Sequence, residues 1–121
     1  MKIYENMGYE LIEKIKSREL SINEVVESCF ERIDETEPLL HSFVHLTKEK
    51  SLKKAKKLDA DLAKGKSIGK LYGLPLANKD LICIKDVPTT CCSEILKGYY
   101  PPYNATVIER LIEEAEAIHI G

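Results

Sequence analysis

Lys79 is the side chain whose surroundings most clearly suggest acid–base chemistry. It follows the apolar run Leu74–Ala77, precedes Asp80, and is followed by a second apolar run, Leu81–Ile84. A lysine between buried segments is desolvated, and desolvation favours the neutral amine, which can act as a general base near pH 7. The alternative is a surface turn in which Lys79 and Asp80 form an ion pair, and the spacing alone favours that plainer interpretation.

The remaining polar residues do not form a complete active site. His41 and His45 have the i, i+4 spacing of metal ligands on a helix, but Pro38 and the extended pattern around Phe43 argue against a helix there. Segment 65–70 follows a helix and has too few residues between its glycines for a phosphate-binding loop. No serine lies in a glycine-rich elbow that would expose a nucleophile. We therefore expect neither a metal nor a cofactor in this chain.

Composition and charge narrow the classes of protein. The 121 residues include 18 basic and 20 acidic side chains, and 44% are hydrophobic. A net charge of −2 gives no bulk electrostatic argument for binding nucleic acid or a membrane surface, and no apolar run approaches the ~20 residues of a membrane span. Four cysteines are too sparse for a disulfide scaffold. The N-terminal residues do not resemble a targeting peptide, so we expect a cytoplasmic protein with reduced thiols.

The first half of the chain is predicted to be helical. Residues 8–16 form a short amphipathic stretch. The capping box Ser21–Glu24 predicts the start of a longer helix, and Pro38 is expected to end it. A third helix is predicted over 48–64, with Thr47 as its N-cap. The buried face of the longer helix is predicted to consist of Ile22, Val25, Val26, Cys29, Phe30 and Ile33.

The third predicted helix is rich in lysine. Residues 48–66 contain eight lysines and three acidic residues. Its buried stripe is predicted to be Leu52, Ala55, Leu58 and Leu62, and the side facing solvent to carry Lys50, Lys53, Lys54 and Lys57. Such a face could bind an acidic partner such as RNA, although a solvated helix face is the favoured interpretation.

The second half is predicted to begin a parallel sheet. Strands are expected near 74–77 and 117–120, with His119 an ordinary strand residue, and Asn104 is expected to cap the helix between them. This strand–helix–strand order implies a parallel pair covered by helices. We expect the pair to be unfinished, because a parallel sheet needs neighbours on both sides, and to expose an edge at 117–120. The helix is predicted to bury Val107, Ile108, Leu111, Ile112 and Ala115.

Three segments resemble the amidase signature family: Leu71–Asp80 (LYGLPLANKD), Val87–Ser93 (VPTTCCS) and Pro101–Leu111 (PPYNATVIERL). The predicted helices also follow the order of that family, so the resemblance covers nearly the whole chain. Within the family the chain is most similar to the A subunits of glutamyl-tRNA(Gln) amidotransferases. The resemblance implies an α/β fold in which 1–121 is the N-terminal fragment of a single amidase domain. In it, 1–65 is mainly helical, and 66–121 begins a mixed or parallel sheet covered by helices.

The resemblance also implies a reaction. The family's motif Gly-x-Pro-x-Ala-x-Lys-Asp, in which x is hydrophobic, supplies the lysine of a Ser–cis-Ser–Lys triad, and Lys79 is the matching residue. Its amine would take a proton from a bridging serine, which activates the serine that attacks the side-chain amide of glutamine and releases ammonia. Both serines are expected beyond Gly121, and Ser93 cannot replace them because it lies in a matched segment. The 121-residue chain is therefore expected to be inactive alone.

The same resemblance implies partners for the full-length protein. They are the amidotransferase B and C subunits, glutamine as the substrate, and tRNA contacted indirectly through the complex. The B subunit would use ATP and magnesium to activate glutamyl-tRNA and would receive the ammonia. No cofactor is expected in the present chain.

Three residues depart from the family pattern. Asn78 replaces a hydrophobic residue before the lysine, and Leu81 stands where asparagine is common. Glu116 occupies a position usually held by glycine, where a left-handed helix end needs no side chain. Two alternatives remain: a stand-alone amidase acting on small amides, and a noncatalytic module that binds tRNA or a partner through 48–66. The predicted helices and the segment 89–91 favour the amidotransferase interpretation.

Overall fold

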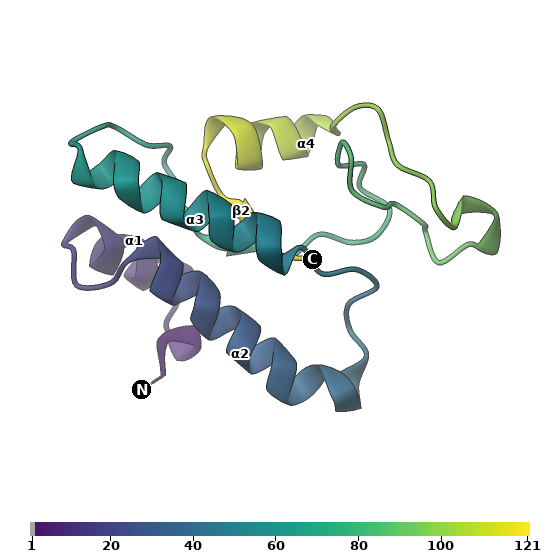
Figure 1. The fold of residues 1–121 in the computed structure, drawn as a ribbon, viewed down its shortest axis with the longest axis horizontal. Coiled ribbons are helices and arrows are strands. Elements are labelled where there is room, and N and C mark those ends of the chain that lie inside the picture. The colour runs from purple at the N-terminus through teal and green to yellow at the C-terminus, as the bar shows by residue number, and fades with distance from the viewer. Residues whose placement is uncertain (1) are drawn as a thin grey trace.

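Three helices precede the sheet, as predicted. The computed structural model describes residues 2–121. Figure 1 shows the helices on one side and a long looped segment reaching away from them on the other. The elements in chain order are η1 (Ile3–Glu5), α1 (Gly8–Lys16), α2 (Ile22–Leu40), α3 (Lys48–Ala63), β1 (Pro75–Leu76), η2 (Glu94–Leu96), α4 (Thr106–Ile108), its π-helical continuation η3 (Glu109–Glu114), and β2 (Ile118–His119).

The start of α2 confirms the predicted capping box. The Ser21 hydroxyl accepts a hydrogen bond from the Glu24 amide at 3.1 Å, and the Glu24 carboxylate accepts one from the Ser21 amide at 2.8 Å. The Asp59 carboxylate of α3 accepts from the Ile22 and Asn23 amides, both at 2.9 Å. Because the first amides of a helix have no partner within the helix, these bonds also join α2 to α3.

The end of α2 differs from the prediction, because the helix continues through Pro38 to Leu40. A proline costs its helix one backbone hydrogen bond, and here it lies in the last turn, where little helix remains to be disrupted. The helix ends instead at His41, which has a left-handed conformation with φ 49° and donates its amide to the Glu37 carbonyl. The Glu37 carboxylate then accepts from the Phe43 amide at 2.7 Å.

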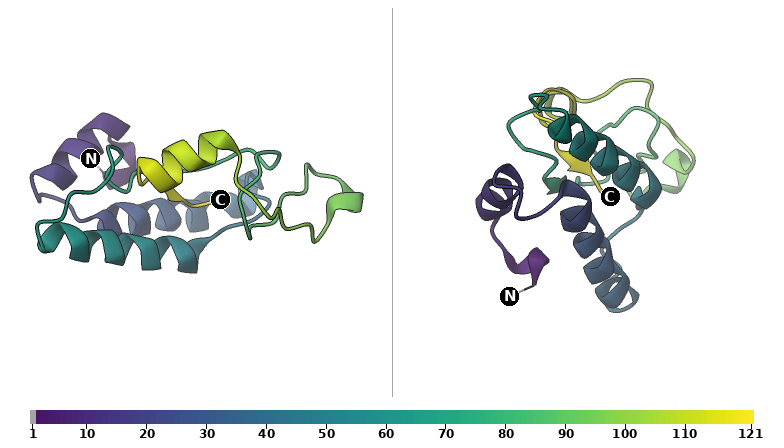
Figure 2. Two further views of the ribbon diagram at one scale, coloured as in Figure 1. Left: turned by 90° about the horizontal axis from the view of Figure 1, so that it is seen from above. Right: turned by 60° about the vertical axis from the view of Figure 1, so that its left-hand side comes forward.

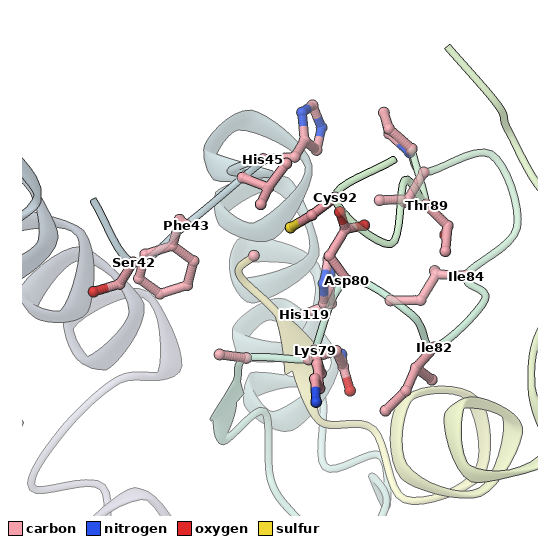
Figure 3. A pocket seen from close by; sticks show the side chains of 16 residues that line it. Ser42, Phe43, His45, Lys79, Asp80, Ile82, Ile84, Thr89, Cys92 and His119 are labelled. Carbon is pink, nitrogen blue, oxygen red and sulfur yellow. The ribbon is translucent and has the colours of Figure 1, made fainter. Parts of the chain in front are cut away.

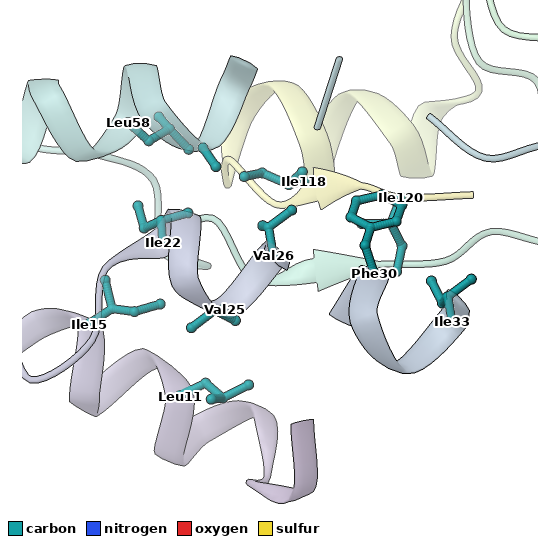
Figure 4. Packing of buried hydrophobic residues seen from close by; sticks show 11 residues of the cluster. Leu11, Ile15, Ile22, Val25, Val26, Phe30, Ile33, Leu58, Ile118 and Ile120 are labelled. Atoms are coloured by element: carbon teal, nitrogen blue, oxygen red, sulfur yellow. The ribbon is translucent and has the colours of Figure 1, made fainter. Parts of the chain in front are cut away.

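The core lies between the helices and β2 (Figure 4). The stripe predicted for α2 is buried, except that Cys29 is half-buried. Burying each large apolar side chain contributes ~1.5–3 kcal/mol, so this cluster is the main source of stability in the described chain. Its buried members are Leu11, Ile15, Ile22, Val25, Val26, Phe30, Ile33, Ala55, Leu58, Ile118 and Ile120.

The two strands pair in parallel, as the strand–helix–strand order predicts. Pro75 faces Ile118 and Leu76 faces His119. The apolar run 81–84 forms a turn and an irregular segment. Figure 2 shows the strands lying against the helices, with the loop between β1 and α4 extending to one side.

The predicted exposed edge at 117–120 is wrong. The side chains of Ile118 and Ile120 are buried. The His119 carbonyl accepts from the Thr47 hydroxyl at 2.9 Å and from the Ser51 hydroxyl at 2.6 Å, and the Ile120 carbonyl accepts from the Thr47 amide at 3.0 Å. Thr47 is the N-cap residue of α3 as predicted, but its side chain makes no capping bond. The start of α3 therefore covers the outer edge of β2.

Lys54 also departs from its predicted position on the solvent face. Its amine donates to the carbonyls of Ile112 at 2.9 Å and Ala117 at 3.1 Å, and the side chain is half-buried. Burial lowers its pKa. Both carbonyls belong to the end of η3 and the residues after it, where helical carbonyls lack partners. Lys54 is therefore a structural link between α3 and the second half of the chain.

The helix before β2 begins one residue later than predicted, with Ala105 as its N-cap. The Asn104 side chain instead accepts from the Lys85 amide and donates to Glu109, both at 2.7 Å. Ile112 is buried as predicted, as is Ile108, whereas Val107 is 44% exposed because it precedes Ile108 on the outer side of the first turn.

Glu116 confirms the expected left-handed position, with φ 56°. Its carboxylate accepts from the Gly69 amide at 2.5 Å and its carbonyl accepts from the Gly73 amide at 2.8 Å. A Cβ atom on Gly69 would lie 2.4 Å from the carbonyl carbon of Ala115. The absence of a side chain at Gly69 therefore permits the close approach of this loop to the end of η3.

Candidate active site

The pairing of β1 with β2 places Lys79. The Asn78 amide donates to the Gly121 carbonyl at 2.8 Å, so the backbone is held to the end of the chain up to the residue before the lysine. The Lys79 carbonyl then accepts from the amides of Leu81 and Ile82 at 2.8 and 3.0 Å. These bonds close a turn, and Lys79 lies at its beginning.

Lys79 is exposed in the described chain, so the predicted desolvation is not seen there. The reason is that the apolar run after it does not form a strand beside β1, and Leu81 is itself 52% exposed. The Asn78 side chain is less accessible, and its Nδ2 atom is buried without a hydrogen-bond partner among residues 2–121. The first departure from the family pattern thus leaves a polar atom unsatisfied beside Lys79.

Asp80 does not pair with Lys79. Its carboxylate accepts from the Thr90 amide at 2.9 Å and also from the Thr90 hydroxyl. The Asp80 carbonyl accepts from the Cys91 amide at 2.8 Å, and the Thr90 hydroxyl accepts from the Cys92 amide at 3.1 Å. The surface turn of the plainer interpretation is therefore present, but the ion pair between Lys79 and Asp80 is not. Two segments that resemble the amidase signature family are joined at this point.

A cavity of about 480 Å³ adjoins Lys79 (Figure 3). Its wall combines the Lys79 turn with the end of β2, the segment after α2 and the loop after residue 86. The lining residues include Phe43, His45, Asn78, Lys79, Asp80, Ile82, Thr89, Cys92, His119 and Gly121. The cavity therefore offers an amine, a carboxylate, two imidazoles and a thiol beside apolar side chains.

His119 is a second titratable group in this wall. It is half-buried, its Nδ1 lies 3.4 Å from the Thr47 hydroxyl, and burial lowers its pKa. A neutral imidazole at this position can donate or accept one hydrogen bond. The strand position predicted for His119 is confirmed, but no sequence pattern indicates that it borders the same cavity as Lys79.

The paired histidines and the cysteines of residues 2–121 do not form a metal site or a disulfide. His41 ends α2 and His45 follows in a non-helical segment, so the two do not share a helical turn. All four cysteines are free thiols. Among residues 2–121, no group of three or more His, Cys, Asp or Glu side chains is gathered as for a metal ion. The same residues contain no helix with the length and apolar character needed to cross a bilayer.

Thr90 is the residue of this region that sequence reasoning missed. It bonds to Asp80 from ten residues away, across an irregular loop. Neither helical nor strand periodicity relates the two positions. The one available signal was that both lie in segments matching the same family, which does not indicate a contact.

Comparison with known proteins agrees with this geometry. The model of the Amidase family matches residues 24–121. The chain is 45% identical to the glutamyl-tRNA(Gln) amidotransferase A subunit of Natranaerobius thermophilus over 121 residues, which are all of this chain and 24% of that relative. It is 46% identical to the protein of the same name from Staphylococcus haemolyticus, covering 96% of this chain and 24% of that one. The chain thus spans about a quarter of the length of these curated relatives.

Solved structures with a similar fold also include a member of the amidase signature family. A chain from an inhibitor-bound vestigial protein complex, described in connection with the origins of an s-triazine catabolic enzyme, matches with a TM-score of 0.88 and 32% identity. The match covers 96% of this chain and 25% of that one. A bacterial aryl acylamidase of the amidase signature family matches with a TM-score of 0.88 at 24% identity, covering 96% and 24% of the two chains, which supports the fold alone. The family model, the relatives and the fold together show that this chain belongs to the amidase signature family.

Proposed function

We propose that this chain is the N-terminal part of the glutaminase subunit of a glutamyl-tRNA(Gln) amidotransferase. The observation that carries the proposal is the 45% identity, along the whole chain, to a relative bearing that subunit's name. The complete protein would hydrolyse glutamine and supply ammonia for converting Glu-tRNA(Gln) to Gln-tRNA(Gln). It would act in the cytoplasm.

In this proposal Lys79 is the base of a Ser–cis-Ser–Lys triad. Its neutral amine accepts the proton of the bridging serine, which in turn accepts the proton of the nucleophilic serine. The nucleophile attacks the carboxamide carbon of glutamine, the proton taken up by the amine returns through the bridging serine to the leaving nitrogen, and the C–N bond breaks to release ammonia and leave an acyl-serine. Water would then hydrolyse the acyl-serine to glutamate and free serine. Both serines would come from chain beyond Gly121. That chain would also cover the cavity beside Lys79 and remove the amine from water, which favours its neutral form.

The proposal assigns partners outside this chain. The B subunit would bind ATP and magnesium, activate glutamyl-tRNA and receive the ammonia, and the C subunit would hold the complex together. The tRNA would be contacted through the complex. Members of the same family that act alone on small amides are the alternative, because the described fold is shared with an aryl acylamidase.

The test uses residues 1–121 fused to the remaining chain of the Natranaerobius thermophilus relative and purified with its B and C subunits. We expect Lys79→Ala and Lys79→Arg each to reduce ammonia release by ~10²–10⁴-fold, the range for a lost general base. Arginine keeps the charge but does not lose its proton in a protein. The 121-residue chain alone should release ammonia from glutamine at the uncatalysed rate.

The possible results separate the candidates. Activity that survives Lys79→Arg would rule out Lys79 as the base. Turnover of small amides without glutamine hydrolysis would favour a stand-alone amidase. Binding of tRNA by the 121-residue chain that weakens steeply with salt would favour a noncatalytic module acting through 48–66.

A further inference from the structure

The position of Asp80 next to Lys79 raises a chemical problem for a base. A carboxylate close to an amine favours the charged ammonium form, and an ammonium group cannot accept a proton. If Lys79 has the role proposed above, on which this inference rests, its neighbouring carboxylate must be engaged elsewhere.

Thr90 donates to both oxygens of that carboxylate. One oxygen of Asp80 accepts from the Thr90 amide at 2.9 Å, and the other accepts from the Thr90 hydroxyl. Hydrogen bonds to an ionised acceptor are about twice as strong as those between neutral groups. Both bonds come from one residue, so the orientation of the carboxylate is fixed by the position of Thr90.

The loop around Thr90 is in turn fixed to the same turn of the chain. The Cys91 amide donates to the Asp80 carbonyl at 2.8 Å, and the Cys92 amide donates to the Thr90 hydroxyl at 3.1 Å. The Thr90 hydroxyl therefore has both an acceptor and a donor, and its rotation is restricted. The arrangement is built from backbone as well as side-chain bonds.

Lys79 is left without an acidic partner. Among the six ion pairs within residues 2–121 none involves Lys79. Figure 3 shows the Lys79 amine and the Asp80 carboxylate pointing to opposite sides of the chain. The other titratable groups lining the same cavity are His45, His119 and Cys92, none of which is a carboxylate.

We propose that Thr90 is a positioning residue that holds the Asp80 carboxylate away from Lys79, and so leaves the amine free to act as a base. Thr90 does not touch the reacting atoms. It acts through Asp80, by removing the ion pair that adjacent lysine and aspartate residues would otherwise form.

The test measures the reactivity of the Lys79 amine in the 121-residue chain. Trace acetylation at pH 8, followed by mass spectrometry, reports the neutral fraction of each lysine, and exposed Lys53 serves as the internal reference. In Thr90→Val a methyl group replaces the hydroxyl, so the carboxylate keeps only the bond from the Thr90 amide and its other oxygen is free to turn toward the amine. We expect acetylation of Lys79 relative to Lys53 to fall by about two- to fivefold, the size of a weak exposed ion pair.

Three matched variants make the test specific. Thr90→Ser keeps the hydroxyl and should retain the original rate. Asp80→Asn removes a charge that does not face Lys79 and should also leave the rate unchanged. The double variant Thr90→Val with Asp80→Asn should return the rate to that of the unmodified chain, because no carboxylate remains to pair with the amine. Circular dichroism and the acetylation rate of Lys53 show whether each variant keeps its fold.

Two results would overturn the inference. One is an unchanged Lys79 rate in folded Thr90→Val. The other is a faster Lys79 rate in Asp80→Asn, which would mean that the carboxylate already faces the amine. Neither readout depends on catalysis. Failure of the proposed function would appear separately, as ammonia release that survives Lys79→Arg in the completed complex.

Discussion

In residues 2–65, side chains three and four positions apart share the buried face of a helix, whereas in residues 66–121 the contacts that fix the chain join positions far apart in sequence. The first region has three helices and most of the buried cluster. The second has two strands of two residues each, separated by a long loop that contains η2 and by the short helix formed by α4 and η3. Its shape depends on single bonds such as those from Thr90 to Asp80 and from Gly69 to Glu116.

The turn that carries Lys79 is held in position by the helical region. Lys79 lies in the irregular region, but its turn is held to β2, and β2 is covered by α3 and the core. The helical region therefore acts as a support for a loop that has little apolar contact of its own. Functional residues are commonly placed on loops held by a rigid scaffold.

The largest expected loss of stability comes from a substitution in the helical region, residues 2–65. Phe30 is 1% exposed and shares the core with Ile120. Phe30→Ala should cost ~3–5 kcal/mol through lost contacts and a cavity, so amide hydrogen exchange in α2, α3 and β2 should become ~10²–10⁴-fold faster. Leu39→Ala is the control, because that side chain is 85% exposed in the same helix. Equal effects of the two changes would mean that the core is not where the structure places it.

A smaller loss of stability is expected in residues 66–121, where the backbone at Gly69 lies close to the backbone at Ala115. In Gly69→Ala the new Cβ atom must displace the backbone at Ala115, at a cost of ~1–3 kcal/mol for overpacking. The amides of Leu71 and Gly73, which donate to Ala115 and Glu116, should lose protection first. Helix α2 should be little affected.

Gly98→Ala is a contrasting substitution, because Gly98 is uncrowded and left-handed whereas Gly69 is crowded and not left-handed. That glycine has φ 82° with open space around it, so its substitution measures the cost of the backbone conformation alone. If Gly69→Ala perturbed α2 as strongly as Leu71, the separation of the two regions would be incorrect.

Substitution of Ser21, the N-cap residue of α2, is expected to reduce stability by a smaller amount. Ser21→Ala removes the acceptor for the Glu24 amide and should cost ~1 kcal/mol. Exchange in the first turn of α2 should rise roughly fivefold. Ser21→Asn supplies another capping acceptor and should behave nearly as the original chain, whereas a loss as large as that of alanine would show that the hydroxyl does something other than capping.

The smallest expected effect is a pH dependence at the junction of the two regions. Burial lowers the pKa of His119 below 6.5 in the folded chain, so between that lowered value and 6.5 the unfolded chain binds a proton that the folded chain does not. The contribution of His119 to stability should therefore be fully present above pH 6.5 and fall as the pH decreases from there to the lowered pKa. Exchange of the β2 amides, corrected for intrinsic rates, measures this. His119→Gln should remove this residue's part of the slope, and an identical slope would assign it to other groups.

Regular elements were predictable because their causes are local. The capping residues and the repeat of apolar positions identified α2 and α3 closely, and the order of elements identified the parallel pair. The prediction that Pro38 ends α2 was wrong, because the disruption that a proline causes depends on how much helix lies around it. Lys54 misled because its partners, the Ile112 and Ala117 carbonyls, are distant in sequence.

The sequence was sufficient to predict that Lys79 belongs to the candidate site, but not which side chains surround it. The family motif identified Lys79, and no sequence pattern relates it to His119 or indicates which group engages Asp80. Those relations arise from how the loop after β1 folds on itself and from the place of the end of β2 beside Lys79. A periodic pattern carries information about one element, whereas such contacts depend on several elements at once.

The bond from the Asn78 amide to the Gly121 carbonyl has a consequence for the order in which the protein acquires its shape. Contacts between distant residues form late because a long loop must first be closed, and a chain emerges from the ribosome N-terminal end first. The helices can therefore pack while the second half is still being synthesised. The turn that carries Lys79 gains its anchor only after residue 121 has emerged, so the catalytic candidate is among the last parts of this chain to become ordered.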